Sequence, residues 1–140
     1  ALKYSSPPDR DYDEMQKYSN IFNVINNGGK PVRCHQLGGR GFISSTATAE
    51  ATHELKIWKF MEEKRYDEAQ AEIDRVQGPI GEWRKKATSE SGGYQHVKAY
   101  MTTVGRDVGR TRPPSQWPSD KLMGELHDIF SDLGWPVAEL

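Results

Sequence analysis

The sequence is short of three features that would narrow its function at once. It has one cysteine, Cys34, among 140 residues, and this excludes an internal disulfide. It has no uninterrupted apolar run near the ~20 residues of a membrane-spanning helix. Ala1-Leu2 is too short for the apolar core of a signal peptide. These absences predict a cytoplasmic protein without a membrane partner.

The chain also lacks an excess of either charge. Its 19 Lys and Arg residues nearly balance 20 Asp and Glu residues, for a formal net charge of −1. Because nucleic-acid binding needs a basic patch or stripe, we expect no nucleic-acid partner. What is present, 35% hydrophobic and 28% charged residues, is the ordinary composition of a globular chain of about one domain.

Spacings of three and four between apolar residues predict most of the helices. The first runs from Asp11 to about Ile25 on the apolar face of Tyr12, Met15, Tyr18, Phe22 and Ile25, and stops at the Asn-Asn-Gly-Gly of 26–29. Further helices are expected over 48–86 with a link at 64–66, over 94–104 up to Gly105, and over 122–133 up to Gly134. In the first of these we expect Leu55, Trp58 and Met61 to be buried. Residues 106–120 have too many Gly and Pro for a regular element.

Short strands are predicted at three places: the end of one at Ala1-Leu2, one at Val32 and a stronger one over 41–46. Alternating strands and helices predict an α/β fold with parallel strands, but so few strands cannot close a sheet. The expected organisation is a strand-bearing region at 1–48 and a helical region at 49–140. We expect the chain to be part of something larger.

Three motifs allow a catalytic or metal-binding interpretation, and a simpler one is preferred for each. Cys34-His35 has no second Cys-His cluster, and on a strand the two side chains would point to opposite faces, so no metal is expected. The glycines of 38–41 lack the Lys-Ser/Thr of a phosphate loop. His53-Glu54 lacks the second histidine of a metalloprotease helix and is predicted to lie on a solvated helix face.

Five segments resemble one family, the dihydrodipicolinate synthase and N-acetylneuraminate lyase family of Schiff-base aldolases and dehydratases. Ala1-Leu2-Lys3-Tyr4-Ser5 resembles its strand-end lysine motif, and QLGGRGFISSTAT at 36–48 resembles its eighth barrel strand. Its C-terminal helices are resembled by RYDEAQAEIDRVQGPI at 65–80, GGYQHVKAYMTTVG at 92–105 and GRTRPP at 109–114. The similarity spans nearly the whole chain.

The resemblance implies the C-terminal part of a TIM (β/α)8 barrel, from the end of the sixth strand onward, followed by extra helices. Lys3 would then be catalytic. Barrel active sites lie at the C-terminal ends of the strands, where partial desolvation favours the neutral amine that attacks a 2-keto acid. From composition alone, Lys3 would be only a solvated terminal lysine. The family's proton-relay tyrosine and carboxylate-binding loop would belong to earlier strands.

The resemblance also assigns two substrate-binding positions. The backbone carbonyl of Ile43 would lie near the bound keto acid, and Ser45 matches the position where the lyase branch uses a hydroxyl on the polyol part of the substrate. The hydroxyls of Ser44, Ser45 and Thr46 could instead satisfy strand-end and helix-cap hydrogen bonds. Only ten residues, 30–39, separate the first predicted helix from the strand at 41–46, so either the seventh barrel helix is missing or 22–25 hides the seventh strand.

Two functions from different classes follow. The first is a pyruvate-type class I lyase without a cofactor, acting on pyruvate or a keto-deoxy sugar acid, and forming a homo-oligomer or pairing with a complementing N-terminal half. Its RPP segment resembles the keto-deoxy-sugar-acid dehydratases more than the alternative, 4-hydroxy-tetrahydrodipicolinate synthase. The second is a non-catalytic helical interaction fragment with an exposed sheet edge.

Overall fold

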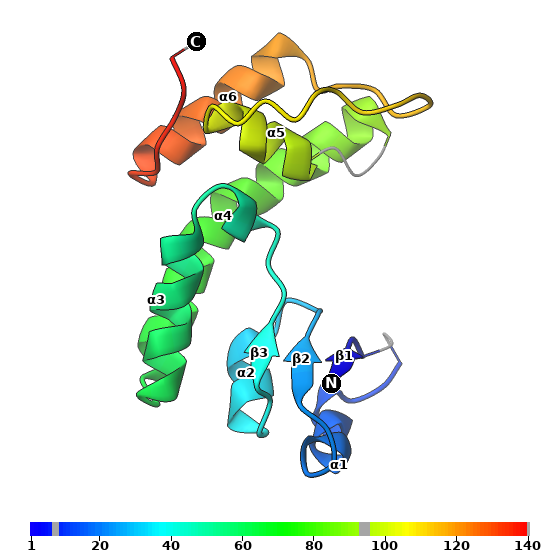
Figure 1. Ribbon diagram of the computed structural model, residues 1–140, viewed down its shortest axis with the longest axis vertical. Coiled ribbons are helices and arrows are strands. Elements are labelled where there is room, and N and C mark those ends of the chain that lie inside the picture. Colours follow the sequence, from blue (N-terminus) through cyan, green and yellow to red (C-terminus); the bar gives the residue numbers. More distant parts are fainter. Residues whose placement is uncertain (7–8, 93–95, 140) are drawn as a thin grey trace. The chain divides into compact units, whose positions relative to one another are not determined.

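Two compact units make up the chain in a computed structural model that describes residues 1–6, 9–92 and 96–139. The first unit contains residues 1–44 and 55–70, and the second contains 45–54 and 71–140. Figure 1 shows the order of the elements along the chain. Within the described ranges, no helix is both long and apolar enough to cross a lipid bilayer.

The first unit contains a parallel sheet of three short strands, β1 (Leu2–Tyr4), β2 (Val24–Asn26) and β3 (Gly41–Phe42), in that order (Figure 1). In the register, Lys3 pairs with Ile25 and Ile25 pairs with Gly41. Strands that are consecutive in sequence are thus neighbours in space and point the same way, which requires a crossover between each pair. The strand end predicted at residues 1–2 is confirmed. The strand predicted over 41–46 is confirmed only at 41–42, because Thr46 begins a 3₁₀ helix, η2 (Thr46–Thr48).

The predicted helix over 11–25 is wrong in its second half. A 3₁₀ helix, η1 (Tyr12–Met15), and one turn of α-helix, α1 (Gln16–Ser19), are followed by β2. The β-branched residues Val24 and Ile25 fit a pleated strand as well as a helix face, and pairing with β1 decides between them. The alternative, in which this stretch hides a strand, is the one confirmed.

The predicted strand at Val32 is wrong, because residues 31–36 form the helix α2 (Pro31–Gln36). Proline at the first helical position lacks only an N–H that would have no partner there, so Pro31 favours a helix start. The helix ends at Gln36, Gly38 follows it with a φ of +88°, and the Gly39 N–H donates to the Cys34 carbonyl over 2.8 Å. A Cβ at Gly39 would lie 2.3 Å from the Cys34 Sγ, so this turn requires glycine there.

One face of the sheet in the first unit packs on η1 and α2. The buried cluster consists of Tyr12, Met15, Val24, Cys34 and Leu37, with Leu2 and Tyr4 against it. An ion pair from Arg33 to both carboxylate oxygens of Asp13 joins α2 to η1. The strands therefore bury one face through alternate residues, as strand geometry requires.

Helices dominate the rest of the chain: α3 (Ala51–Glu62), α4 (Tyr66–Ser91), α5 (His96–Thr103) and α6 (Asp120–Asp132). The helix stops predicted at Gly105 and Gly134, both with positive φ, are confirmed. The predicted link at 64–66 is confirmed one residue earlier, at 63–65, because α4 already begins at Tyr66. The start of the helix predicted over 94–104 falls outside the described residues. Leu55 was expected to be buried but is exposed.

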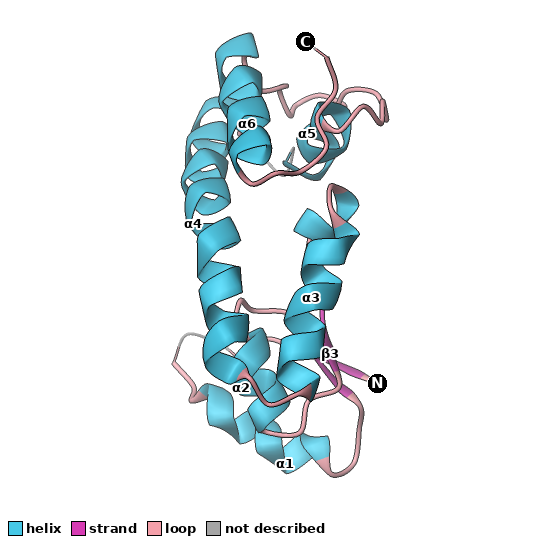
Figure 2. Cartoon of the chain, turned by 90° about the vertical axis from the view of Figure 1, so that its left-hand side faces the viewer, coloured by secondary structure: helices cyan, strands magenta, loops and turns pink. Residues whose placement is uncertain are grey.

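The second unit has its own hydrophobic core. Figure 2 shows α6 beside α4 and α5, and apolar side chains from all three helices meet between them. Trp83 on α4 is fully buried, and its indole N–H donates to the Leu122 carbonyl on α6 over 2.7 Å. Tyr100 on α5 and Phe130 on α6 are also fully buried, with ring centroids 5.7 Å apart. This core holds the second unit together and contains no residue of the sheet.

Candidate active site

Lys3 lies in the middle of β1, on the face of the sheet opposite the buried cluster of the first unit. Its neighbours Leu2 and Tyr4 are half-buried against that cluster, whereas Lys3 is exposed. Successive residues of a strand point to opposite faces. The Lys3 side chain is therefore directed away from η1 and α2, toward the open face.

The open face continues across the sheet through Ile25, Gly41 and Ile43. Ile25 is in register with both Lys3 and Gly41, and a Cβ at Gly41 would lie 3.1 Å from the Ile25 Cδ1. Ile43 follows two residues later, and its N–H donates to the Asn26 carbonyl over 2.9 Å. The Ile43 side chain is 51% exposed. Two of the three residues proposed from sequence are thus at this sheet: Lys3 lies within β1, and Ile43 directly follows β3.

Phe42 points the other way and packs near α3. It is in register with Asn26, and its ring centroid lies 6.4 Å from that of Trp58. On α2, His35 contacts the same helix region: Nε2 is 3.2 Å from Glu62 Oε1, and the ring meets Trp58 edge-on at 5.4 Å. Side chains of α2 and α3 therefore cover this face, which leaves the Lys3 face as the one available for chemistry.

On the covered side of the sheet, burial raises the pKa values of two side chains, Tyr12 and Cys34. Burial is the main cause that raises the pKa of Tyr12, and a hydrogen bond to Cys34 adds to it. Burial likewise raises the pKa of the Cys34 thiol. Cys34 and His35 lie on a helix and not on a strand as expected, yet they still face different partners: Cys34 faces Tyr12 and His35 faces Glu62. Among the described residues, no group of three or more His, Cys, Asp or Glu side chains could hold a metal ion.

Ser45, the third residue proposed from sequence, is the first residue of the second unit. It is half-buried and immediately precedes the 3₁₀ helix η2 (Thr46–Thr48). Its carbonyl accepts hydrogen bonds from the Thr48 N–H (3.2 Å) and the Thr48 hydroxyl (2.7 Å). Its backbone is therefore fixed within this unit.

The prediction of a solvated face at His53-Glu54 is wrong. His53 is 4% exposed, with its Nδ1 3.3 Å from Glu72 Oε1, and Glu54 accepts a hydrogen bond from the Thr46 hydroxyl over 2.5 Å. The sequence feature that could have indicated the Thr46–Glu54 contact is the run of three hydroxyl residues at 44–46, which lies eight to ten residues before Glu54. Helical periodicity alone could not reveal a partner from before the helix.

The fold defined by these units is that of consecutive parallel β/α elements followed by a helical region. Solved structures that match the chain include dihydrodipicolinate synthases and N-acetylneuraminate lyases. The dihydrodipicolinate synthase of Aquifex aeolicus matches with a TM-score of 0.74 at 14% identity, over 99% of this chain and 47% of that one. The N-acetylneuraminate lyase of Fusobacterium nucleatum matches with a TM-score of 0.73 at 19% identity, over 93% and 43%.

The chain therefore spans less than half the length of these structures. A dihydrodipicolinate synthase from Thermotoga maritima gives the same result, with a TM-score of 0.71 at 15% identity over 96% of this chain and 46% of that one. This share is consistent with the expected C-terminal half. No protein-family model matches the sequence, and neither does any curated protein.

Proposed function

We propose that this chain supplies the Schiff-base lysine of a pyruvate-type class I lyase, with Lys3 as the nucleophile. The supporting observation is the alternation on β1: Leu2 and Tyr4 pack on the helices, and Lys3 alone faces the opposite side. In a β/α barrel the side without helices is the interior, and active sites lie at the C-terminal ends of the strands. The likeness to lyase structures supports the same class.

The chemistry proposed for Lys3 begins with its neutral amine. The amine adds to the C2 carbonyl of a 2-keto acid, and loss of water leaves a protonated imine. When the bond between C3 and C4 breaks, its electron pair moves toward the imine nitrogen to form an enamine, and the C4 hydroxyl loses its proton as an aldehyde departs. Protonation at C3 and hydrolysis then release pyruvate and the free lysine. A dehydratase would use the same imine to acidify C3 before a hydroxyl leaves as water.

The proposed substrate is pyruvate or a keto-deoxy sugar acid. One of the matching structures, an N-acetylneuraminate lyase from Fusobacterium nucleatum, is described as a complex with pyruvate. The Ser45 hydroxyl fits a hydroxylated substrate, and the RPP segment favours a keto-deoxy-sugar-acid dehydratase over 4-hydroxy-tetrahydrodipicolinate synthase. Three strands cannot enclose a barrel, so activity is expected to require assembly into a homo-oligomer or pairing with a complementing N-terminal half.

Reductive trapping tests this proposal. The chain is incubated with pyruvate and sodium borohydride, with and without an N-terminal half taken from a matching lyase, and its intact mass is measured. Borohydride delivers hydride to the imine carbon and makes the adduct permanent. The Lys3→Arg variant is the negative control, and Lys17→Arg, which changes an exposed lysine on α1, is the matched control. An adduct that persists in Lys3→Arg would contradict the proposal.

The second candidate is a non-catalytic helical interaction fragment. One observation favours it: the helical core of the second unit contains no residue of the sheet. In that case neither form of the trapping experiment yields an adduct on Lys3.

A further inference from the structure

An open pocket lies along one side of α4 in the second unit. Its volume is about 600 Å³, which is within the range of pockets that hold small molecules. Each polar side chain of its described lining can donate hydrogen bonds, two of them are positively charged, and none is a carboxylate. The residues that line this pocket, called here the α4 pocket, are Gly81, Arg84, Lys85, Thr88 and Ser89.

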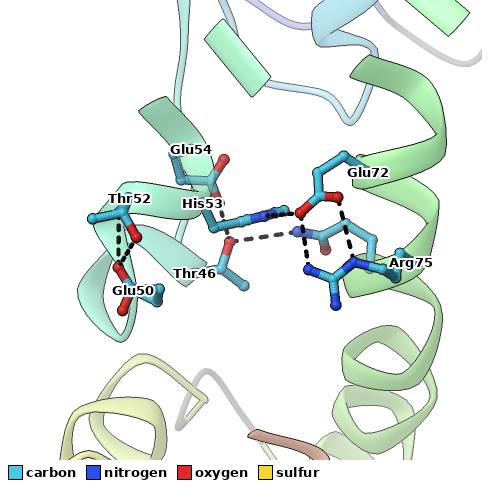
Figure 3. A network of polar contacts seen from close by, with 8 residues as sticks. Thr46, Glu50, Thr52, His53, Glu54, Glu72 and Arg75 are labelled. Atoms are coloured by element: carbon cyan, nitrogen blue, oxygen red, sulfur yellow. Dashed lines mark hydrogen bonds and ion pairs between the residues drawn. The ribbon is translucent and has the colours of Figure 1, made fainter. Parts of the chain in front are cut away.

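The charge of Arg84 in this pocket is not neutralised. Arg84 is half-buried, and its Nη2 donates to the uncharged Gln77 Oε1 over 3.2 Å, but it forms no ion pair with any residue that the structure describes. By contrast, Arg75 on the same helix donates to Glu72 Oε1 over 2.8 Å (Figure 3). Because a charge withdrawn from water is costly unless it is paired, Arg84 is poised for an anion that is not part of the described chain.

The neighbours of Arg84 on α5 leave its charge in place. Arg84 Nε and the hydroxyl of the fully buried Tyr100 have no hydrogen-bond partner among the described residues. Burial raises the pKa of Tyr100, and the charge of Arg84 opposes that rise. Burial lowers the pKa of His96, and the same charge adds to the effect. The guanidinium is therefore close to a neutral phenol and to an imidazole whose protonation it disfavours.

From these observations we propose that the α4 pocket binds a phosphate group, with Arg84 as its main ligand and the hydroxyls of Thr88 and Ser89 as further donors. A guanidinium, an ammonium and two hydroxyls offer more donors than the two oxygens of a carboxylate can use, whereas a phosphate ester presents three terminal oxygens. The pocket is larger than one phosphate ion, so the phosphate ester of a small molecule fits it. The site contains no residue of the sheet and does not depend on the chemistry proposed for Lys3.

Lys85 is a secondary ligand in this proposal, because it already has a partner. Its Nζ lies 2.7 Å from Glu82 Oε1, and both side chains are exposed. Exposed ion pairs contribute little to stability, so Lys85 can leave Glu82 for a phosphate at small cost. The largest loss of affinity is therefore expected when Arg84 is replaced.

Calorimetric titration of the full chain with inorganic phosphate and with glycerol 3-phosphate tests the proposal, and glycerol is the uncharged comparison. Both phosphates should bind saturably and glycerol should not. Tighter binding of glycerol 3-phosphate identifies an ester as the ligand, equal affinities identify phosphate itself, and both results support the site. Absence of saturable binding of either phosphate would overturn the proposal and would leave the prediction for Lys3 unaffected.

Two variants on α4 show whether the phosphate is bound in the pocket. Arg84→Gln should bind inorganic phosphate about tenfold more weakly, as expected for the loss of one charge-assisted hydrogen bond. Arg75→Gln removes the same charge from the same helix outside the pocket lining and should bind like the wild type. Equal weakening in the two variants would mean that only the net charge of the chain matters, and it would overturn the proposal.

A second pair of variants keeps the test valid if Arg84→Gln fails to fold. A Cβ at Gly81 would have nothing within 4 Å, and glycine is a poor residue for a helix interior, so Gly81→Glu and Gly81→Gln should both fold. They differ only in charge, and Gly81→Glu should bind phosphate at least about tenfold more weakly than Gly81→Gln. Equal affinities of these two variants would overturn the proposal.

The imidazole of His96 gives a readout next to the site. Bound phosphate offsets the charge of Arg84, so the pKa of His96, measured by NMR titration, should rise toward its ordinary value. The rise should be absent in Arg84→Gln. A pKa of His96 that stays the same while phosphate binds to the wild type would place the phosphate elsewhere and overturn the proposal.

Discussion

The phenol of Tyr12 donates a hydrogen bond to the side-chain oxygen of Asn26 over 2.7 Å, and both residues are buried beneath the sheet. Tyr12 follows β1 and Asn26 ends β2, so the bond joins two successive β/α elements on the side away from Lys3. Tyr12 thereby helps to set where β2 ends relative to β1. The orientation of the proposed nucleophile depends on that framework.

Replacing Tyr12 by Phe should therefore destabilise the first unit. The change removes the donor and leaves the buried Asn26 oxygen without this partner, which should cost about 1–3 kcal/mol in the free energy of unfolding. Urea denaturation measures the loss. Tyr18→Phe is the matched control, because Tyr18 is exposed on α1 and its change should stay within about 0.5 kcal/mol. Equal losses in the two variants would contradict the structural role of the Tyr12 hydroxyl.

The same buried groups predict a loss of stability at alkaline pH. The folded state raises the pKa values of Cys34 and Tyr12 above their usual range, so it stays protonated where the unfolded chain releases protons. Stability is full below the unfolded pKa values, about 8.5 for the thiol and about 10 for the phenol, and falls as pH rises past each. Each group contributes up to about 1.4 kcal/mol per pH unit.

Denaturation midpoints measured on either side of pH 9 test this prediction. In Cys34→Ala, the decline that begins near the thiol pKa should disappear, while the decline that begins near the phenol pKa remains. The comparison uses the slopes, because removing Cys34 also changes the packing. A wild-type slope that is flat up to about pH 11 would show that neither group is held protonated by the fold.

Trp83 anchors the second unit, and Trp83→Phe should weaken it. The substitution removes the hydrogen bond to the Leu122 carbonyl and part of a fully buried ring, at a cost of about 1–3 kcal/mol. Trp117→Phe serves as the control, since Trp117 is only half-buried at the edge of the same core. Thermal unfolding followed by circular dichroism should show a lower midpoint for the first variant only. Indistinguishable midpoints would mean that α4 and α6 are held together by other contacts.

The amount of structure that could be predicted from the sequence differed between the two units. Helices α5 and α6 were found because their apolar residues recur on one face and glycines with positive φ end them. Strand β2 was assigned to a helix because Phe22 and Ile25 fit a helical spacing, although Phe22 is exposed and Ile25 lies on a strand. Three-residue strands leave too little alternation to outweigh that spacing, and only the pairing with β1 reveals them.

In the candidate site, too, residues in short motifs could be predicted from the sequence, whereas contacts between distant residues could not. Lys3 and Ile43 could be proposed from short motifs. The strand register then aligns Lys3 with Ile25 and Ile25 with Gly41, and Ile43 follows β3. Helical periodicity could not predict the contact of Glu54, because its partner Thr46 precedes the helix. Side chains that join a turn to a helix become visible only when the contact itself is known.

The unpaired edges of the sheet predict that the chain on its own associates with other copies of itself. In the described sheet β1 and β3 are the edge strands, and unpaired edges favour pairing with other chains. Light scattering should give a mass that rises with concentration and a defined mass once the N-terminal half is added. Ile43→Lys places a charge directly after the edge strand β3 and should reduce self-association. Leu55→Lys, at an exposed site on α3, should not. A concentration-independent monomer would contradict the expectation.

The most direct test of the central claim is peptide mapping of the borohydride-reduced protein after incubation with pyruvate and the N-terminal half. The account predicts a single modified peptide that carries the reduced adduct on Lys3, and its loss in Lys3→Arg but not in Lys17→Arg. An adduct on another lysine, or no adduct when the two halves are together, would contradict the claim that Lys3 is a Schiff-base nucleophile.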